Sequence, residues 1–219
     1  NSKTFQIKRW RLGWWILVTT GLEVKNVAFG FLTMITQTIS QVSDEEITMA
    51  IKMIKEHHDS KILLIGMGRS GLVARAFALR LLHLGFKVYV LGDTLVPSIE
   101  QKDLVIAISG SGTTRLILAT VEAAKHIGAK ILVFTSFPDS PLGKLADCIV
   151  KVKGRIIGED ESGRDYFARQ VLGLHEPLAP LGTLFEDSCM ILLDAFISIL
   201  MKELNITEEE MGKRHANIE

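Results

Sequence analysis

Four hydroxyl side chains and two glycines occupy six consecutive positions where an apolar run gives way to an amphipathic stretch. They are Ser109, Gly110, Ser111, Gly112, Thr113 and Thr114. The run 104–108 predicts a strand, and the stretch from Arg115 predicts a helix. Such a strand-to-helix turn exposes backbone N–H groups at the positive end of the helix dipole, and hydroxyls add hydrogen bonds to the same anion. We predict a cradle for one phosphate group; the alternative is a polar turn with Thr113 or Thr114 as helix cap.

A second glycine-rich turn, residues 66–71, reads Gly-Met-Gly-Arg-Ser-Gly between another predicted strand and helix. With Asp93 near the end of the following strand, this is formally the fingerprint of a dinucleotide-binding turn. A short chain and a second anion-binding turn at the next strand end favour one compact phosphorylated ligand instead. We expect Gly68, Arg69 and Ser70 to face that ligand, without a nicotinamide cofactor. The structural alternative is that the glycines serve only a tight turn.

Glu186 is the best candidate for an acid/base group. It lies in the first turn of a predicted apolar helix, after Gly182 and Thr183. A carboxylate there can face the strand ends across a partly dry site. The same four residues, 183–186, also form a capping box, in which Glu186 would only accept a backbone N–H. The residues alone leave both roles open, and the neighbouring Asp187 is an alternative base.

The histidines and cysteines give weaker signals. Of the six His residues, His215 follows Lys213-Arg214 near the end of the sequence, where a surface or helix-end role is the default. No set of His, Cys and carboxylate residues has the spacing of metal ligands, so we predict no metal and no cofactor. Cys148 and Cys189 lie in apolar surroundings and are predicted to be buried free thiols, as expected in the cytoplasm.

Composition restricts the class of protein. The 219 residues include 25 Lys and Arg against 25 Asp and Glu, and 47% are apolar. A balanced charge gives no support for nucleic-acid binding, which needs a basic face. The apolar run 12–22 follows four basic residues but is too short to span a membrane, and no cleavage site of small residues follows it. We treat residues 1–22 as a tail of uncertain status and residues 23–219 as a single domain, without nucleic-acid or membrane partners.

The remaining pattern alternates strands with helices. A long amphipathic helix is predicted from Val24, and a second one after the capping residues 43–46, as a hairpin suited to oligomerisation. Strands are predicted at 61–65, 87–91, 103–109, 130–136 and 148–152, and helices at 69–84, 115–127, 141–146, 183–204 and after Thr207. The alternation predicts a doubly wound parallel sheet with ligands at the carboxyl ends of its strands. Residues 153–182 lack periodicity and are predicted to form a functional or disordered loop.

Taken together, these motifs resemble the sugar isomerase (SIS) domain family. The resemblance rests on segments 66–71, 80–86, 92–98, 109–112, 181–186 and 213–217, in this order. Within the family the chain is most similar to the 6-phospho-3-hexuloisomerase branch. Residues 1–22 match nothing in this pattern, and residues 153–176 are longer than the corresponding link in compact members.

The resemblance implies a five-stranded parallel sheet between helices, flavodoxin-like in form, and a homo-oligomer that is a tetramer. It implies interconversion of D-arabino-3-hexulose 6-phosphate and fructose 6-phosphate through a cis-enediolate. Phosphate binding is implied for Ser70, Ser109, Ser111 and Thr114, and the acid/base role for Glu186. In related isomerases a His from a neighbouring subunit assists, which makes His215 a secondary catalytic candidate. Alternatives are an isomerase of another sugar phosphate, such as arabinose 5-phosphate, and a non-catalytic module that binds a sugar phosphate.

Overall fold

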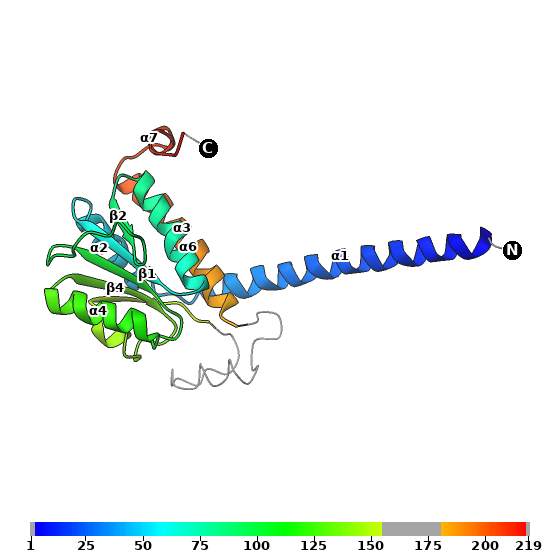
Figure 1. Cartoon of the computed structure of the whole chain (residues 1–219), viewed down its shortest axis with the longest axis horizontal. Coiled ribbons are helices and arrows are strands. Elements are labelled where there is room, and N and C mark those ends of the chain that lie inside the picture. Colours follow the sequence, from blue (N-terminus) through cyan, green and yellow to red (C-terminus); the bar gives the residue numbers. More distant parts are fainter. Residues whose placement is uncertain (1–2, 155–180, 218–219) are drawn as a thin grey trace.

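A five-stranded parallel sheet forms the centre of the molecule (Figure 1). In this computed structural model the backbone is described for residues 3–154 and 181–217, and the side chains for residues 20–154 and 181–217. The strands are β1 (Lys61–Gly66), β2 (Lys87–Val90), β3 (Leu104–Ile108), β4 (Lys130–Thr135) and β5 (Cys148–Lys151). They lie in the order β2-β1-β3-β4-β5. This confirms the predicted fold class, and its order is that of a flavodoxin-like sheet.

Helices cover both faces of the sheet. They are α1 (Lys3–Ile39), α2 (Asp44–Glu56), α3 (Arg69–His83), α4 (Arg115–Ile127), α6 (Thr183–Glu203) and α7 (Glu208–Lys213), with a 3-10 turn η1 (Gly143–Leu145). One core cluster joins α2, α3 and α6 to one face, and a second joins α4 to the other. Successive side chains of a strand point to opposite faces. Accordingly Ile62 and Leu64 enter the first cluster, whereas Leu63 and Ile65 enter the second.

The order of the strands creates a switch point between β1 and β3. From β1 the chain crosses to β2 on one side, then returns to β3 on the other. The last residues of these two strands, Gly66 and Ile108, are register partners. Ligands of open α/β sheets bind at the carboxyl ends of the strands beside such a switch point. Both glycine-rich turns therefore begin side by side where a ligand is expected.

The first helix differs most from the sequence prediction. It was expected from Val24, but α1 is continuous from Lys3 and crosses the boundary between residues 22 and 23 without a break. No proline interrupts this stretch, so nothing in the local sequence ends the helix. Among the side chains that the structure describes, the last turns of α1 pack on the body, where Ile35 and Leu184 of α6 form a small cluster. The rest of α1 projects from the molecule (Figure 1).

Smaller differences concern the short elements. The helix expected at 141–146 is only the 3-10 turn η1. The apolar residues of 183–204 lie nearly all round the helix and predict that it is buried, but Ile191 and Ile199 of α6 face solvent. The prediction for residues 153–182 falls mostly outside the described residues. Where the structure describes the chain, no helix is both long and apolar enough to cross a membrane.

Candidate active site

The turn at residues 109–114 is held in shape by its own hydroxyl groups and by the end of β4. The N–H of Gly112 donates to Ser109 Oγ at 3.3 Å, and Thr113 donates from N and Oγ1 to Ser111 Oγ at 3.3 and 3.2 Å. Gly112 has φ +62°, and a side chain there would overlap Ser140. Because Ser109 and Ser111 use their oxygens as acceptors inside the turn, their hydroxyl protons are available to a ligand.

The helices that follow the two turns begin without side-chain caps. The N-cap residue of α3 is Gly68, with φ +58°, and that of α4 is Thr114; neither makes a capping hydrogen bond from its side chain. Neither first turn contains an acidic residue. Thr114 thus occupies the N-cap position that the alternative interpretation gave it, but its side chain does not cap the helix. The uncapped N–H groups and the dipoles of α3 and α4 make this edge of the sheet attractive to an anion.

Arg69 links the first turn to the start of α6. Its Nε donates to Glu186 Oε2 at 2.5 Å, and its Nη2 donates to Asp187 Oδ1 at 2.9 Å. The Glu186 side chain is only 13% exposed, whereas Arg69 and Asp187 are more open. The hydrogen bond to Glu186, helped by both negative charges and opposed by partial burial, raises the pKa of Arg69. The result is a compact cluster of two carboxylates and one guanidinium at the edge of the switch point.

The structure tests the capping-box interpretation of Glu186. The N-cap of α6 is Gly182, not Thr183, and it makes no side-chain capping hydrogen bond. The carboxylate of Glu186 instead faces Arg69 on a different helix. The capping-box interpretation of residues 183–186 is therefore wrong. The carboxylate of Glu186 is therefore held by a distant residue, Arg69, which lies in the first glycine-rich turn.

Phe185 joins the two halves of this site, and its role was missed from the sequence. Its ring lies directly against Gly110, so the turn at 109–114 rests on the first turn of α6. Ser140 and Thr135 support the same turn from the end of β4, where Thr135 Oγ1 donates to the carbonyl of Gly110 at 3.4 Å. Polar residues at and after the end of a third strand, β4, are visible in the sequence and indicated this support, but the prediction did not use them.

His215 lies far from this cluster in the same chain. Its ring is 5.1 Å from that of His83, at the opposite end of α3 from Arg69. At 1.5 Å per residue, the length of α3 separates the two ends by about 21 Å. Thus His215 cannot assist Glu186 of its own chain in this arrangement.

Asp93 is engaged in another contact. Its carboxylate pairs with Arg75 of α3 at 2.8 Å, and both side chains are about half exposed. Among the described residues, no group of three or more His, Cys, Asp or Glu could hold a metal ion.

Both cysteines are free and buried, as predicted. Burial raises the pKa of Cys148 to about 11. Burial, followed by the charge of Glu186, raises the pKa of Cys189 well above its usual range. Both thiols therefore stay protonated near neutral pH and are poor nucleophiles.

Comparison with known proteins places this geometry in context. The SIS domain matches residues 36–157. An uncharacterised protein of Aeropyrum pernix is 58% identical over 73% of this chain and 74% of its own length. A 3-hexulose-6-phosphate isomerase of Bacillus subtilis is 35% identical over 81% of this chain and 89% of its own. A Methanococcus jannaschii protein, whose crystal structure was taken to imply the function of a 3-hexulose-6-phosphate isomerase, is 33% identical, with a TM-score of 0.69 over 90% of this chain and 99% of its own.

Proposed function

The chain belongs to the SIS domain family, and from this membership we propose that it interconverts D-arabino-3-hexulose 6-phosphate and fructose 6-phosphate. Relatives 35–39% identical to it are named 3-hexulose-6-phosphate isomerases, which supports a sugar-phosphate isomerase. The observation that carries the proposal is the position of Glu186, a largely buried carboxylate beside two uncapped helix N-termini. An acid/base group next to an anion cradle is what isomerisation of a phosphorylated sugar requires.

In this proposal the phosphate binds at the ends of β1 and β3. Its oxygens accept hydrogen bonds from Ser70, Ser109, Ser111 and the Thr114 turn, with backbone N–H groups of residues 68–70 and 110–114. Arg69 holds Glu186 and stays close to the ligand. Binding at the phosphate fixes the sugar chain, and orientation of this kind can supply much of the rate acceleration.

Glu186 then moves one proton between neighbouring carbons. As a carboxylate it takes the proton from C2, and the electrons of that C–H bond form the C2–C3 double bond of a cis-enediolate while the C3 carbonyl becomes an alkoxide. The same group returns the proton to C3, the oxygen on C2 loses its proton as the new carbonyl forms, and the oxygen on C3 ends protonated. General base catalysis contributes about 10²–10⁴-fold. The reaction needs no net oxidant, and one carboxylate can serve both steps.

The finer proposals follow the family resemblance. We place the protein in the cytoplasm as a homo-oligomer, a tetramer, with His215 acting from a neighbouring copy. The distance of His215 from Glu186 within one chain fits this assignment, because only another copy can bring the two together.

A coupled assay for fructose 6-phosphate formation from the 3-hexulose phosphate tests the proposal directly. We expect turnover with this substrate and little with arabinose 5-phosphate; the reverse preference would identify another isomerase of the family. Binding of both sugar phosphates without turnover would identify a non-catalytic module. A nicotinamide dinucleotide that raised the melting temperature would contradict the site assignment.

Two variants test the acid/base group. Glu186→Gln should lower kcat by about 10²-fold or more, in line with the loss of a general base, while sparing the fold. Asp187→Asn, its neighbour on the same Arg69, should retain most of the activity. If Asp187→Asn is the inactive variant, Asp187 is the base; if both variants turn over like wild type, neither carboxylate moves the proton.

A further inference from the structure

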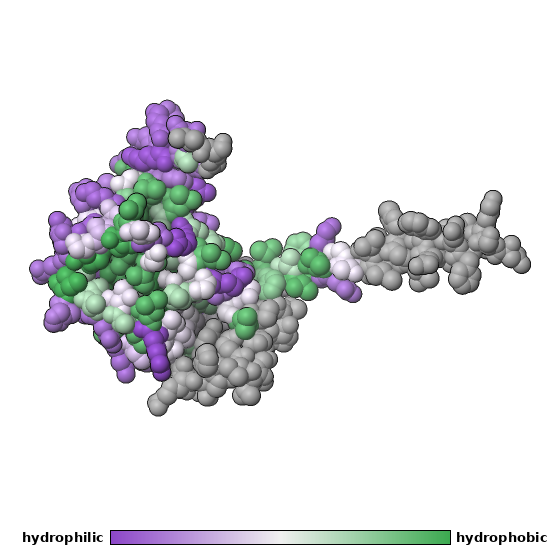
Figure 2. Space-filling view, in the orientation of Figure 1, coloured by the Kyte–Doolittle hydropathy of each residue, from purple (hydrophilic) through white to green (hydrophobic). Residues whose placement is uncertain are grey.

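Arg69 joins the glycine-rich turn 66–71 to the start of α6. It is the first residue of α3, so its backbone belongs to the turn whose N–H groups we propose for the phosphate. Its side chain reaches Glu186 Oε2 at 2.5 Å and Asp187 Oδ1 at 2.9 Å, both in the first turns of α6. The two helices begin close together near the foot of α1, where Figure 2 shows hydrophilic side chains on the surface. One side chain thus connects the two halves of the proposed site.

A cation at the beginning of a helix is unusual. The positive end of the helix dipole disfavours a positive side chain in the first turn. The two carboxylates of α6 compensate this repulsion, and the hydrogen bond to Glu186, opposed by partial burial, raises the pKa of Arg69. Arg69 is therefore charged wherever these carboxylates are ionised, and the contact persists over that range of pH.

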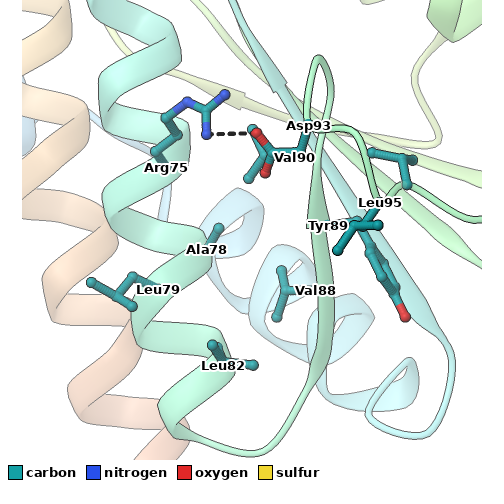
Figure 3. Close-up of a pocket in the computed structure, with 10 residues that line it drawn as sticks. Arg75, Ala78, Leu79, Leu82, Val88, Tyr89, Val90, Asp93 and Leu95 are labelled. Carbon is teal, nitrogen blue, oxygen red and sulfur yellow. Dashed lines mark ion pairs between the residues drawn. The ribbon is translucent and has the colours of Figure 1, made fainter. Parts of the chain in front are cut away.

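The ion pair is not needed to dock α3 on α6, because buried apolar residues of both helices already pack in one core cluster. Exposed ion pairs add little to stability. Figure 3 shows such a pair farther along α3, where Arg75 meets one carboxylate, Asp93, and both side chains are about half exposed. Arg69 differs because it bridges two carboxylates of another helix, and one of them, Glu186, is only 13% exposed.

The geometry holds one oxygen of Glu186 and leaves the other open. The N–H groups of a guanidinium have fixed directions in one plane, so hydrogen bonds to two partners define its orientation and theirs. Among the described residues, the only hydrogen bond to the Glu186 carboxylate comes from Arg69 and goes to Oε2. The Oε1 atom is then free to accept a proton, and a general base must reach the proton that it removes.

We propose that Arg69 is a positioning residue, which couples binding of the phosphate to the placement of Glu186. A phosphate bound by the N–H groups of residues 68–70 fixes the backbone of Arg69, and the guanidinium fixes the carboxylate beside C2 and C3 of the same sugar. The proposal rests on the proposed function, because it needs a phosphorylated substrate and Glu186 as the base. Binding energy from the phosphate, remote from the reacting carbons, then raises kcat.

The other role for an arginine beside an anion cradle is to bind the phosphate itself. The contacts favour positioning, because Nε and Nη2 of Arg69 already donate to the two carboxylates of α6. A phosphate ligand mainly affects the binding of substrate, whereas a residue that aligns the base affects the chemical step. The two roles therefore differ in whether KM or kcat changes.

Steady-state kinetics with the 3-hexulose phosphate separate these roles. Arg69→Gln should lower kcat by about 100-fold, as expected for a misplaced base, and change KM by less than about threefold. Arg69→Lys should recover only part of kcat, because one ammonium group lacks the planar fork. A raised KM with wild-type kcat in Arg69→Gln would make Arg69 a phosphate ligand and overturn the proposal.

Lys125→Gln is the matched control. Lys125 pairs with Asp147 at 3.0 Å, with similar exposure, in the last turn of α4 and thus away from the phosphate turn. This variant should keep wild-type kinetics. Circular dichroism and the melting temperature show that each variant is folded. Loss of kcat in Lys125→Gln equal to that in Arg69→Gln would mean a general effect of losing an ion pair, which would overturn the proposal.

The sugar without its phosphate tests the coupling itself. Wild-type protein should convert D-arabino-3-hexulose to fructose slowly, and inorganic phosphite, a dianion that fits the cradle, should raise this kcat/KM by about tenfold or more. Arg69→Gln should lose the activation although phosphite still binds, as measured by competition with the phosphorylated substrate. Absence of activation in wild type, or equal activation in Arg69→Gln, would overturn the coupling.

Failure of the proposed function would give a different result. In that case the wild-type protein would not turn over the 3-hexulose phosphate. If wild type turns it over and Arg69→Gln matches wild type in kcat, only the role of Arg69 is refuted.

Discussion

Two groups of helices in this protein begin in different ways. Helices α2 and α7 begin with side-chain caps: Ser43 accepts from the N–H of Glu46, and Thr207 forms a complete capping box with Glu210. Each also has three acidic residues in its first turn. Helices α3, α4 and α6 have no side-chain caps, and the first turns of α3 and α4 contain no acid.

The difference follows position. The capped helix α2 begins beside β5, and α7 lies near the far end of α3. The uncapped helices α3 and α4 follow β1 and β3, the strands at the switch point. A cap contributes about 1 kcal/mol, so an uncapped helix forgoes stability. The first N–H groups of α3 and α4 thus have no side-chain cap at the proposed site, whereas α2 and α7 cap theirs with their own side chains.

Adding an acidic cap to an uncapped helix at the site should have the largest effect, because it exchanges ligand binding for capping. Thr114→Asp provides α4 with a capping carboxylate, but it also puts a negative charge where we propose that the phosphate binds. Like charges about 4 Å apart repel by ~4 kcal/mol at an effective dielectric constant of 20, so KM should rise by about 100-fold or more. Steady-state kinetics and a melting curve check the two effects. Unchanged KM would remove the start of α4 from the phosphate site.

Removing one hydroxyl from the cradle should have a smaller effect of the same kind. Ser111→Ala deletes a hydrogen bond to a charged group, worth about 1.5–3 kcal/mol, so KM should rise about tenfold or more. The melting temperature should change little, since Ser111 is bonded only within its own turn among the described contacts. Ser198→Ala, on the exposed side of α6, is the matched control. A stability loss without a change in KM would make Ser111 a structural residue.

Removing a cap away from the site should give the opposite result. Ser43→Ala leaves the N–H of Glu46 without its side-chain acceptor. The free energy of unfolding should fall by about 1 kcal/mol, which corresponds to a melting temperature about 2–4 °C lower. Thermal unfolding and kinetics on the same sample test this, and KM should match wild type. A raised KM would show that capping and ligand binding are not separated.

The end of α3 away from the site allows a fourth prediction, the smallest. His83 is 3% exposed, and burial, followed by repulsion from His215 and Arg80, lowers its pKa below 6.5. As the pH falls, the unfolded chain therefore binds the proton first, and stability is lost below about pH 6.5. The melting temperature should fall between pH 7.5 and 5.5, less so in His83→Asn. The exposed His126→Asn serves as the control; an unaltered slope in His83→Asn would contradict the prediction.

Much of the fold was predictable because its signals are local. Continuous apolar runs marked the buried strands, and Gly128 ended α4 with φ +96°, as a C-cap glycine does. The capping box at Thr207 was also found, since both of its partners lie within four residues. The start of α1 was not predicted: the helix was expected from Val24, but no proline interrupts it between Lys3 and that residue.

The same reasoning failed where a side chain had both a local and a distant partner. Glu46 was expected to complete a capping box with Ser43, but its carboxylate accepts the N–H of Lys151 at 2.7 Å. Glu186 had the spacing of a capping box and pairs instead with Arg69. Spacing along the chain does not show which of two partners is better placed.

The sequence by itself determined the strands, the turns between them and the residue types that can bind a phosphate, because each depends on neighbours within a few positions. Only the tertiary structure decided that Arg69 holds Glu186, 117 residues away, and that His215 lies at the other end of α3. The physical reason is that these contacts depend on how the sheet orders its strands and aligns the helices over them. That arrangement comes from the burial of the whole core and from no single segment.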